Sequence, residues 1–153
     1  MEKLNFPSFS FRVKNSENKS LIFDPFRKKF VVLTPEEWVR QHSLQYLVRE
    51  INYPPSLLAI ERQFELYDTV KRFDIAGFNP QGKISLIVEC KAPQVSITQD
   101  SFDQIARYNL KLQADYLMVT NGLQHYFCQL VYEEERYQFL KQLPSYSQMH
   151  PVL

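Results

Sequence analysis

The sequence predicts a single α/β domain with a mixed β-sheet, in which an antiparallel meander is joined to a parallel crossover and helices flank the sheet. Two segments begin with helix-capping chemistry, and between and after them lie runs with the period-two alternation of strands. The strand–helix–strand order over residues 83–120 is long enough for a right-handed parallel crossover. With 153 residues, 44% of them hydrophobic, the chain suits one domain with a substantial core.

The first half of the chain contains a hairpin and a long helix. Residues 1–18 are mixed and polar and are expected to form a loose arm. "SLIFDPFRKKFVVLT", residues 20–34, predicts two short strands joined by a turn. A helix follows, because Thr34 can cap it and Pro35 suits its first position. The pair of prolines after Tyr53 ends this helix.

Three consecutive strands are expected next, over "LLAIERQFEL", "VKRFDIAGF" and "KISLIVECK". The turn "NPQG" joins the second strand to the third. Thr98 is the expected cap of a helix that runs to about Gln113.

The last part of the chain is expected to form two more strands and a tail. "DYLMVT", an Asn-Gly turn and "LQHYFCQLVY" predict a strand, a tight turn and a strand. The segment from "EEERYQFLKQLP" onward is expected to be a short helix or extended. Residues 19–143 then form the domain, and residues 144–153 are expected to be a mobile tail.

Charge, cysteine content and hydropathy give no sign of a strongly basic nucleic-acid binder, a zinc site, a secreted protein or a membrane protein. The net charge is +1, so nucleic-acid binding would have to rest on a local patch. Cys90 and Cys128 lie in apolar strand-like runs without metal-ligand spacing, which favours buried free thiols in a reducing compartment. The N-terminus lacks the apolar core of a signal peptide and no run approaches the length of a membrane span, so we expect a cytoplasmic protein without membrane contact.

A charged pair interrupts the otherwise apolar strand "LIVECK". Glu89 and Lys91 share one face of this strand because side chains alternate with period two. If Phe78 pairs with Lys83 across the preceding turn, Asp74 lies on the same face as a diagonal neighbour of Glu89. Such neighbours are about 7–8 Å apart between Cα atoms, close enough for both carboxylates to reach one ion.

Two carboxylates on one face repel each other unless a cation lies between them. Oxygen ligands of this kind suit Mg²⁺, or Mn²⁺ as an alternative, with water and a substrate phosphate completing the coordination. Lys91 would orient or help to deprotonate an attacking water and stabilise charge on the phosphate. These residues therefore favour metal-assisted hydrolysis of a phosphodiester. The alternative is a solvent-exposed acid–lysine pair at a sheet end that contributes little.

Polar residues of both helices support the first interpretation. Gln104 and Tyr108 are four residues apart on one helix face and could bind a phosphate or the attacking water. Glu37 and Gln41 extend the buried stripe of the first helix toward the sheet, where Glu37 could bind the metal through water. Ordinary helix packing would explain the same spacing, and Glu36 is explained by the helix dipole.

Two basic clusters are candidates for contact with DNA, although such clusters are commonly solvated surface. Arg72 is expected on the face of the paired carboxylates and Lys71 on the opposite face. The remaining candidates are Arg27, Lys28 and Lys29 in the predicted hairpin. No base-reading element is evident, so we expect no intrinsic sequence specificity.

The order Asp74, Glu89-x-Lys91, Gln104-x-x-x-Tyr108 resembles the PD-(D/E)XK nuclease superfamily, although Phe73 stands where that motif has proline. More narrowly, "LTPEEWVRQ", "VECKAP", "TQDSFDQIARYN" and "VTNGLQHY" resemble the N-terminal nuclease domain of type I restriction enzyme R subunits. The resemblance spans roughly residues 20 to 140.

This resemblance implies a restriction endonuclease-like fold and magnesium-dependent DNA cleavage in restriction defence. It implies that Asp74 and Glu89 are metal ligands, with the Cys90 carbonyl as a third, and that Lys91 is catalytic. Gln104 and Tyr108 would be the accessory motif, and Glu37 would be the acidic residue contributed by a helix. R subunits continue into helicase motors and these residues contain none, so a stand-alone domain served by a separate translocase or specificity subunit is expected. Two alternatives stay open: a non-catalytic module that binds nucleic acid or protein, and a structural α/β interaction domain.

Overall fold

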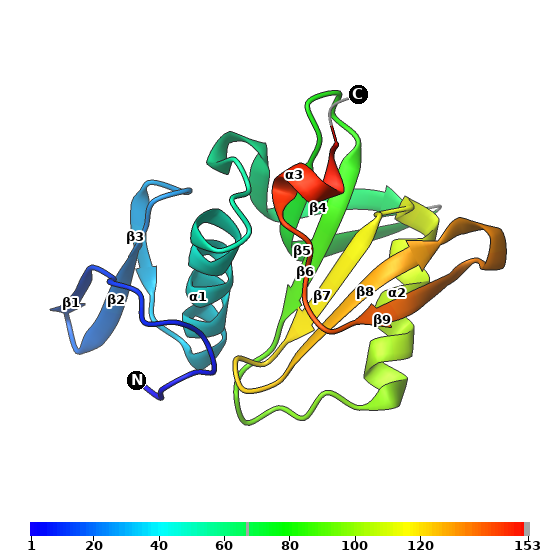
Figure 1. Cartoon of the computed structure of the whole chain (residues 1–153). Coiled ribbons are helices and arrows are strands. Elements are labelled where there is room, and N and C mark those ends of the chain that lie inside the picture. The colour runs from blue at the N-terminus through cyan, green and yellow to red at the C-terminus, as the bar shows by residue number, and fades with distance from the viewer. Residues whose placement is uncertain (67, 152–153) are drawn as a thin grey trace.

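A six-stranded sheet in the order β4-β5-β6-β7-β8-β9 and a three-stranded sheet in the order β1-β2-β3 enclose one long helix, α1 (Figure 1). The computed structural model describes residues 1–66 and 68–151. Its elements are β1 Val13–Ser16, β2 Lys19–Asp24, β3 Lys29–Val32, α1 Pro35–Arg49, the 3₁₀ turn η1 Pro55–Leu57, β4 Leu58–Leu66, β5 Thr69–Phe78, β6 Ile84–Cys90, α2 Gln99–Leu112, β7 Tyr116–Thr120, β8 His125–Val131, the 3₁₀ turn η2 Tyr132–Glu134, β9 Arg136–Leu140 and α3 Tyr146–Met149. The predicted α/β class and mixed sheet are confirmed.

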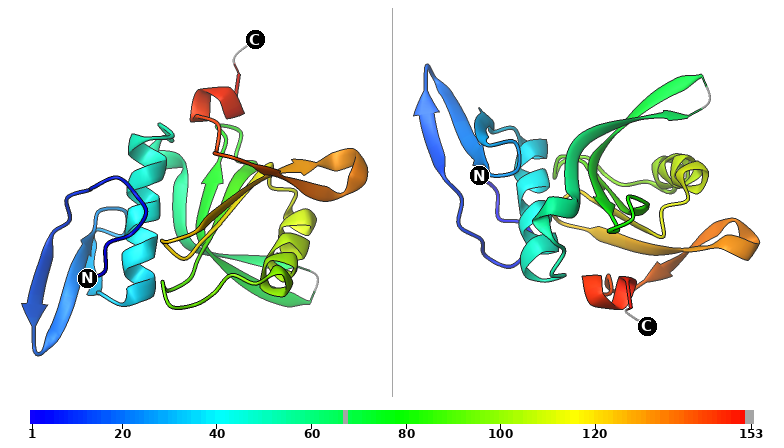
Figure 2. Two further views of the ribbon diagram at one scale, coloured as in Figure 1. Left: turned by 60° about the horizontal axis from the view of Figure 1, so that its bottom comes forward. Right: turned by 90° about the horizontal axis from the view of Figure 1, so that it is seen from above.

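Helices α1 and α2 pack on opposite faces of the large sheet (Figure 2). On the α1 side, Leu44 and Leu47 pack with alternate sheet residues such as Val88. On the α2 side, Phe102 and Ile105 belong to a second apolar cluster, which includes Ile87. Neighbouring residues of β6 therefore enter different clusters, as the alternation of a strand buried on both faces requires.

Local capping fixes where both helices begin, as predicted. The Thr34 hydroxyl accepts a hydrogen bond from the Glu37 N–H at 3.0 Å, and the Thr98 hydroxyl accepts one from the Ser101 N–H at 3.1 Å. Each bond satisfies an N–H that has no partner within the helix. Helix α2 carries the chain between β6 and β7, which pair in parallel as expected for a crossover.

The register of β5 and β6 differs from the predicted one by two residues. Ile75 pairs with Val88, two residues beyond the predicted partner. Phe78 pairs with Ile84, one residue beyond Lys83, and the irregularity next to Gly77 adds the second residue. The turn between them is held by the Asn79 carboxamide oxygen, which accepts the N–H groups of Gln81 and Lys83, both at 2.9 Å. A shift of two residues preserves the face on which each side chain lies.

Both ends of the chain pack more closely than the sequence suggested. In the predicted loose arm, Leu4 is buried in the core and the Asn5 N–H donates to the Gly122 carbonyl at 2.7 Å. Part of the arm also forms β1, which pairs with β2. In the predicted mobile tail, α3 packs against the core and His150 Nε2 lies 2.6 Å from the Ser85 hydroxyl. The last two residues of the predicted tail lie outside the described part of the chain.

The segment after residue 132 was predicted to be either a short helix or extended. It forms the extended strand β9 at one edge of the large sheet.

None of the helices in the described residues has the length and apolar character needed to span a membrane.

Candidate metal centre

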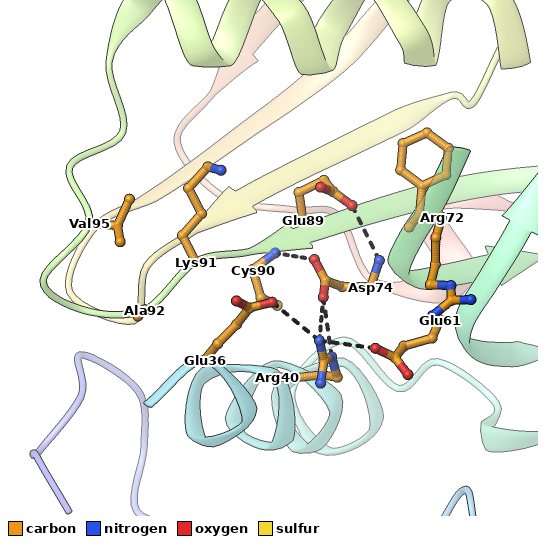
Figure 3. Close-up of a pocket in the computed structure, with 11 residues that line it drawn as sticks. Glu36, Arg40, Glu61, Arg72, Asp74, Glu89, Cys90, Lys91, Ala92 and Val95 are labelled. Atoms are coloured by element: carbon orange, nitrogen blue, oxygen red, sulfur yellow. Dashed lines mark hydrogen bonds and ion pairs between the residues drawn. The ribbon is translucent and has the colours of Figure 1, made fainter. Parts of the chain in front are cut away.

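Two carboxylates occupy the point at which β5 and β6 separate. The paired part of these strands ends at Ile75 and Val88. Beyond it, the Asp74 N–H donates to Glu89 Oε1 at 3.2 Å, and the Cys90 N–H donates to Asp74 Oδ2 at 2.8 Å (Figure 3). Side-chain oxygens thus replace the carbonyl partners that a continued ladder would supply. The hydrogen bonds hold both carboxylates next to each other at the opening of the sheet.

The alternation of β5 is interrupted at Asp74. Phe73 packs in the α2-side cluster, yet Ile75, two residues further, packs in the α1-side cluster. On the neighbouring strand, Glu61 has a left-handed backbone with φ of 52° and is skipped in a register that is otherwise continuous. The interruption moves the residues before Asp74 to the face opposite the one that strict alternation predicts.

A cavity of about 370 Å³ opens at this point. It is lined by Glu36, Arg40, Glu61, Arg72, Phe73, Asp74, Glu89, Cys90, Lys91, Ala92 and Val95 (Figure 3). The structure therefore brings together Asp74, Glu89 and Lys91, the three residues on which the sequence interpretation rests. Arg72 lines the same cavity, although the interruption at Asp74 moves it off the face that strict alternation predicted.

The electrostatics of the cavity suit a cation. Burial, and next the charge of Asp74, raise the pKa of Glu89 to about 7. The same two causes raise the pKa of Glu36. Carboxylates that crowd one another in this way are stabilised by a hard divalent cation, and Mg²⁺ commonly binds one or two of them with water in its other positions. The donor set therefore fits such an ion, although no group of three His, Cys, Asp or Glu side chains within residues 1–66 and 68–151 is arranged to hold one.

Lys91 projects into the cavity from the end of β6. Its N–H donates to the Thr120 carbonyl at 2.9 Å, which continues the pairing of β6 with β7 and fixes the backbone. Its ammonium has no ion-pair partner in the described part of the chain and points away from Arg40 (Figure 3). Its positive charge nevertheless offsets part of the rise in the pKa of Glu89 that burial and Asp74 cause, so it acts on the carboxylate pair.

Lys71 lies closer to the site than the sequence indicated. Its ammonium is 4.0 Å from Glu89 Oε2, whereas strict alternation placed it on the opposite face. The interruption at Asp74 explains this error, because it gives Lys71 the same side as Phe73, whose ring centroid is 5.5 Å from the ammonium.

Gln104 and Tyr108 lie beside the cavity rather than in it. Both line a separate groove along α2. Lys71 connects the two regions, because its ammonium is 5.6 Å from the centroid of the Tyr108 ring and also contacts Glu89.

Glu37 faces the small sheet instead of the cavity. Its Oε1 accepts hydrogen bonds from Arg27 at 2.9 Å and from Arg40 at 2.6 Å, and its Oε2 accepts one from Gln41 at 3.0 Å. Because α1 lies between two sheets, the stripe of Glu37 and Gln41 is buried against the smaller one, where Gln41 also donates to Asp24. Glu36 is the first-turn acid that lines the cavity.

Of the basic residues proposed for DNA contact in the hairpin, Arg27 is engaged internally. Its guanidinium binds Asp24 at 2.5 Å, Glu37 at 2.9 Å and Glu61 at 3.3 Å. Lys28 and Lys29 are exposed at the turn between β2 and β3. Only the two lysines of this cluster therefore present their charge to solvent.

Sequence reasoning missed Arg40, which reaches Asp74 from the middle of α1. Arg40 Nη2 lies 2.6 Å from Asp74 Oδ1, and Nη1 lies 2.6 Å from Glu37 Oε1. The available signal was its spacing, four residues after Glu36 and three after Glu37, which places Arg40 within reach of both carboxylates. Glu61, also missed, approaches the same guanidinium at 3.6 Å.

Comparison with known proteins places this architecture in a family. Residues 35–144 match the family model described as type I restriction enzyme R protein N terminus (HSDR_N). A search of curated proteins finds no match. Among solved structures, a fragment ascribed to the HsdR subunit of a type I restriction enzyme from Vibrio vulnificus YJ016 is similar in fold, with 19% identity and a TM-score of 0.50. The match covers 74% of this chain and 24% of that one, so the chain corresponds to about a quarter of that fragment.

Proposed function

The chain belongs to the family of type I restriction enzyme R protein N termini, and from this premise we propose that it is a metal-dependent DNA endonuclease domain of the PD-(D/E)XK type. The observation that supports the proposal most strongly is the joint position of Asp74, Glu89 and Lys91 in one cavity where two strands separate. The backbone N–H groups that both carboxylates accept hold this arrangement in place.

In this proposal Asp74, Glu89 and the Cys90 carbonyl hold Mg²⁺ or Mn²⁺. The ion, when bound, would polarise the scissile phosphate and lower the pKa of a bound water. The Lys91 ammonium, without a partner in the described chain, is available to orient the attacking water and to stabilise charge that develops on the phosphate. Its fixed backbone limits the entropy lost when it does so.

The residues of α2 are proposed to act on the DNA beside the reacting phosphate. Gln104 and Tyr108 line their own groove, and Lys71 lies between that groove and Glu89. A DNA strand that follows this path would meet hydrogen-bond donors and positive charge in succession, which suits phosphate contacts rather than base reading.

Exposed lysines at the β2–β3 turn are proposed as a second place of phosphate contact. Lys28 and Lys29 face solvent, whereas Arg27 is held by three carboxylates and is left out of this proposal. We also propose that other subunits of a type I system deliver DNA to this domain, since the matching family is that of the R protein of such enzymes.

Cleavage of supercoiled plasmid tests the proposed activity. With Mg²⁺ or Mn²⁺ the wild type should convert supercoiled DNA to nicked circles, EDTA should abolish the reaction, and Asp74→Asn should lose it. Asp103→Asn changes a carboxylate of α2 whose hydrogen-bond partner within residues 1–66 and 68–151 is Gln99, outside the cavity. It is the matched control and should retain the activity.

The same proteins distinguish the remaining alternatives. If the plasmid stays intact but Mn²⁺ raises the thermal stability of the wild type and not of Asp74→Asn, the chain is a metal-binding domain without catalysis. Intact plasmid and no stabilisation by Mn²⁺ would leave a structural interaction domain.

A further inference from the structure

Both oxygens of Asp74 already have partners in the protein. Oδ2 accepts the Cys90 N–H at 2.8 Å. Oδ1 accepts two N–H groups of Arg40, from Nη2 at 2.6 Å and from Nε at 3.2 Å. One oxygen of the proposed metal ligand is therefore bound by a permanent positive charge.

Arg40 is held firmly in this position. Its side chain is 8% exposed, and besides Asp74 it contacts Glu37 at 2.6 Å, Glu36 at 3.4 Å and Glu61 at 3.6 Å. Burial alone would lower its pKa, but the surrounding carboxylates, Asp74 first, raise it. The guanidinium is thus charged at neutral pH.

The charges that line the cavity show what Arg40 does there. Four carboxylates line it, from Glu36, Glu61, Asp74 and Glu89. Of these, Glu36, Glu61 and Asp74 lie within 3.6 Å of the Arg40 guanidinium. Arg40 therefore supplies the positive charge that this side of the cavity needs before a metal ion arrives.

A divalent ion on Asp74 would lie next to that guanidinium. Charges of the same sign repel strongly in a partly buried site, and Mg²⁺ tolerates little distortion of its coordination. We infer that Arg40 and the divalent cation compete for Asp74, so that Arg40 sets the metal affinity of the site. This inference rests on the proposed metal-dependent function, and Arg40 acts in it as a positioning residue.

The variants must separate competition from loss of structure. Arg40→Met alone would leave Glu37 short of one partner in a buried position, which is costly. Glu37→Gln removes that problem in advance, and Glu37 does not line the cavity. The comparison is therefore between Glu37→Gln and the double variant Glu37→Gln/Arg40→Met, with thermal unfolding as the check that both are folded.

The measurement is isothermal titration of each protein with MnCl₂ in the absence of DNA. The double variant should bind Mn²⁺ about tenfold or more tightly than Glu37→Gln, as expected when a charged hydrogen bond no longer has to be given up. Equal or weaker binding by the folded double variant would overturn the inference, because a purely structural Arg40 would not improve binding when removed.

A second variant keeps the test valid if the double variant unfolds. Arg40→Lys retains the charge but cannot make both hydrogen bonds to Asp74, so it should bind Mn²⁺ several-fold more tightly than the wild type. Unchanged or weaker binding would again overturn the inference.

Asp74→Asn shows which proposal has failed. If it binds Mn²⁺ as the wild type does, or if no variant binds, the proposed metal site itself is wrong. If Asp74→Asn loses binding while removal of Arg40 changes nothing, only the competition is wrong.

Discussion

Replacing Glu89 with glutamine should stabilise the metal-free protein at alkaline pH. Burial and the charge of Asp74 raise the pKa of Glu89 from 4.5 to about 7, so the folded protein holds this proton more tightly than the unfolded chain does. Folding stability from this group is therefore full below pH 4.5 and is lost as the pH rises through about 7. The difference corresponds to about 3 kcal/mol at most, from about 1.4 kcal/mol for each pKa unit.

Glutamine removes the ionisation but keeps an oxygen that can accept the Asp74 N–H. In EDTA, Glu89→Gln should therefore exceed the wild type in stability at pH 8 by up to about 3 kcal/mol, or about 6–12 °C in Tm for a domain of this size. The advantage should shrink toward zero at pH 5.

Thermal and urea unfolding at several pH values between 5 and 8 measure this difference. Glu65→Gln, at an exposed position of β4, is the control and should show no such trend. A difference between Glu89→Gln and the wild type that does not change with pH would refute the reasoning.

Three further outcomes follow from the structure. Alanine at both Lys28 and Lys29 should weaken binding of duplex DNA in EDTA, and the slope of log K against log[salt] should fall by the equivalent of about two phosphate contacts. Fluorescence anisotropy measures both. An equal loss of binding in the exposed control Lys141→Ala would contradict this expectation. Gly77→Ala should cost about 1–3 kcal/mol in urea unfolding, since its Cβ would lie 2.7 Å from the Tyr53 hydroxyl; unchanged stability would show that Tyr53 can move. Both cysteines are buried with raised thiol pKa values, so they should react with a disulfide reagent only after unfolding, and rapid reaction of the native protein would contradict their burial.

Sequence patterns predicted the features that depend on nearby residues. Thr34 and Thr98 cap their helices because capping involves only the next few N–H groups. The shared position of Asp74 and Glu89 was also predictable, even though the register was wrong. The error was an even number of residues, so it did not exchange the faces of the strand.

Features that depend on distant segments could not be read from the sequence. The contact of Arg40 with Asp74 requires the docking of α1 on the large sheet, and the turn of Glu37 toward Arg27 requires the small sheet on its other side. The position of Lys71 depends on the interruption of alternation at Asp74. Period-two patterning describes regular strands, and it fails where a site makes the strand irregular.

Single-turnover nicking of supercoiled plasmid by Lys91→Ala tests the central claim most directly. Lys91 lines the cavity without an ion pair to either carboxylate, so its removal should not weaken Mn²⁺ binding, while it slows cleavage by about a hundredfold or more. Lys141→Ala, at an exposed position outside the cavity, should cleave at the wild-type rate. Cleavage by Lys91→Ala at the rate of the wild type would contradict the assignment of this cavity as the nuclease centre.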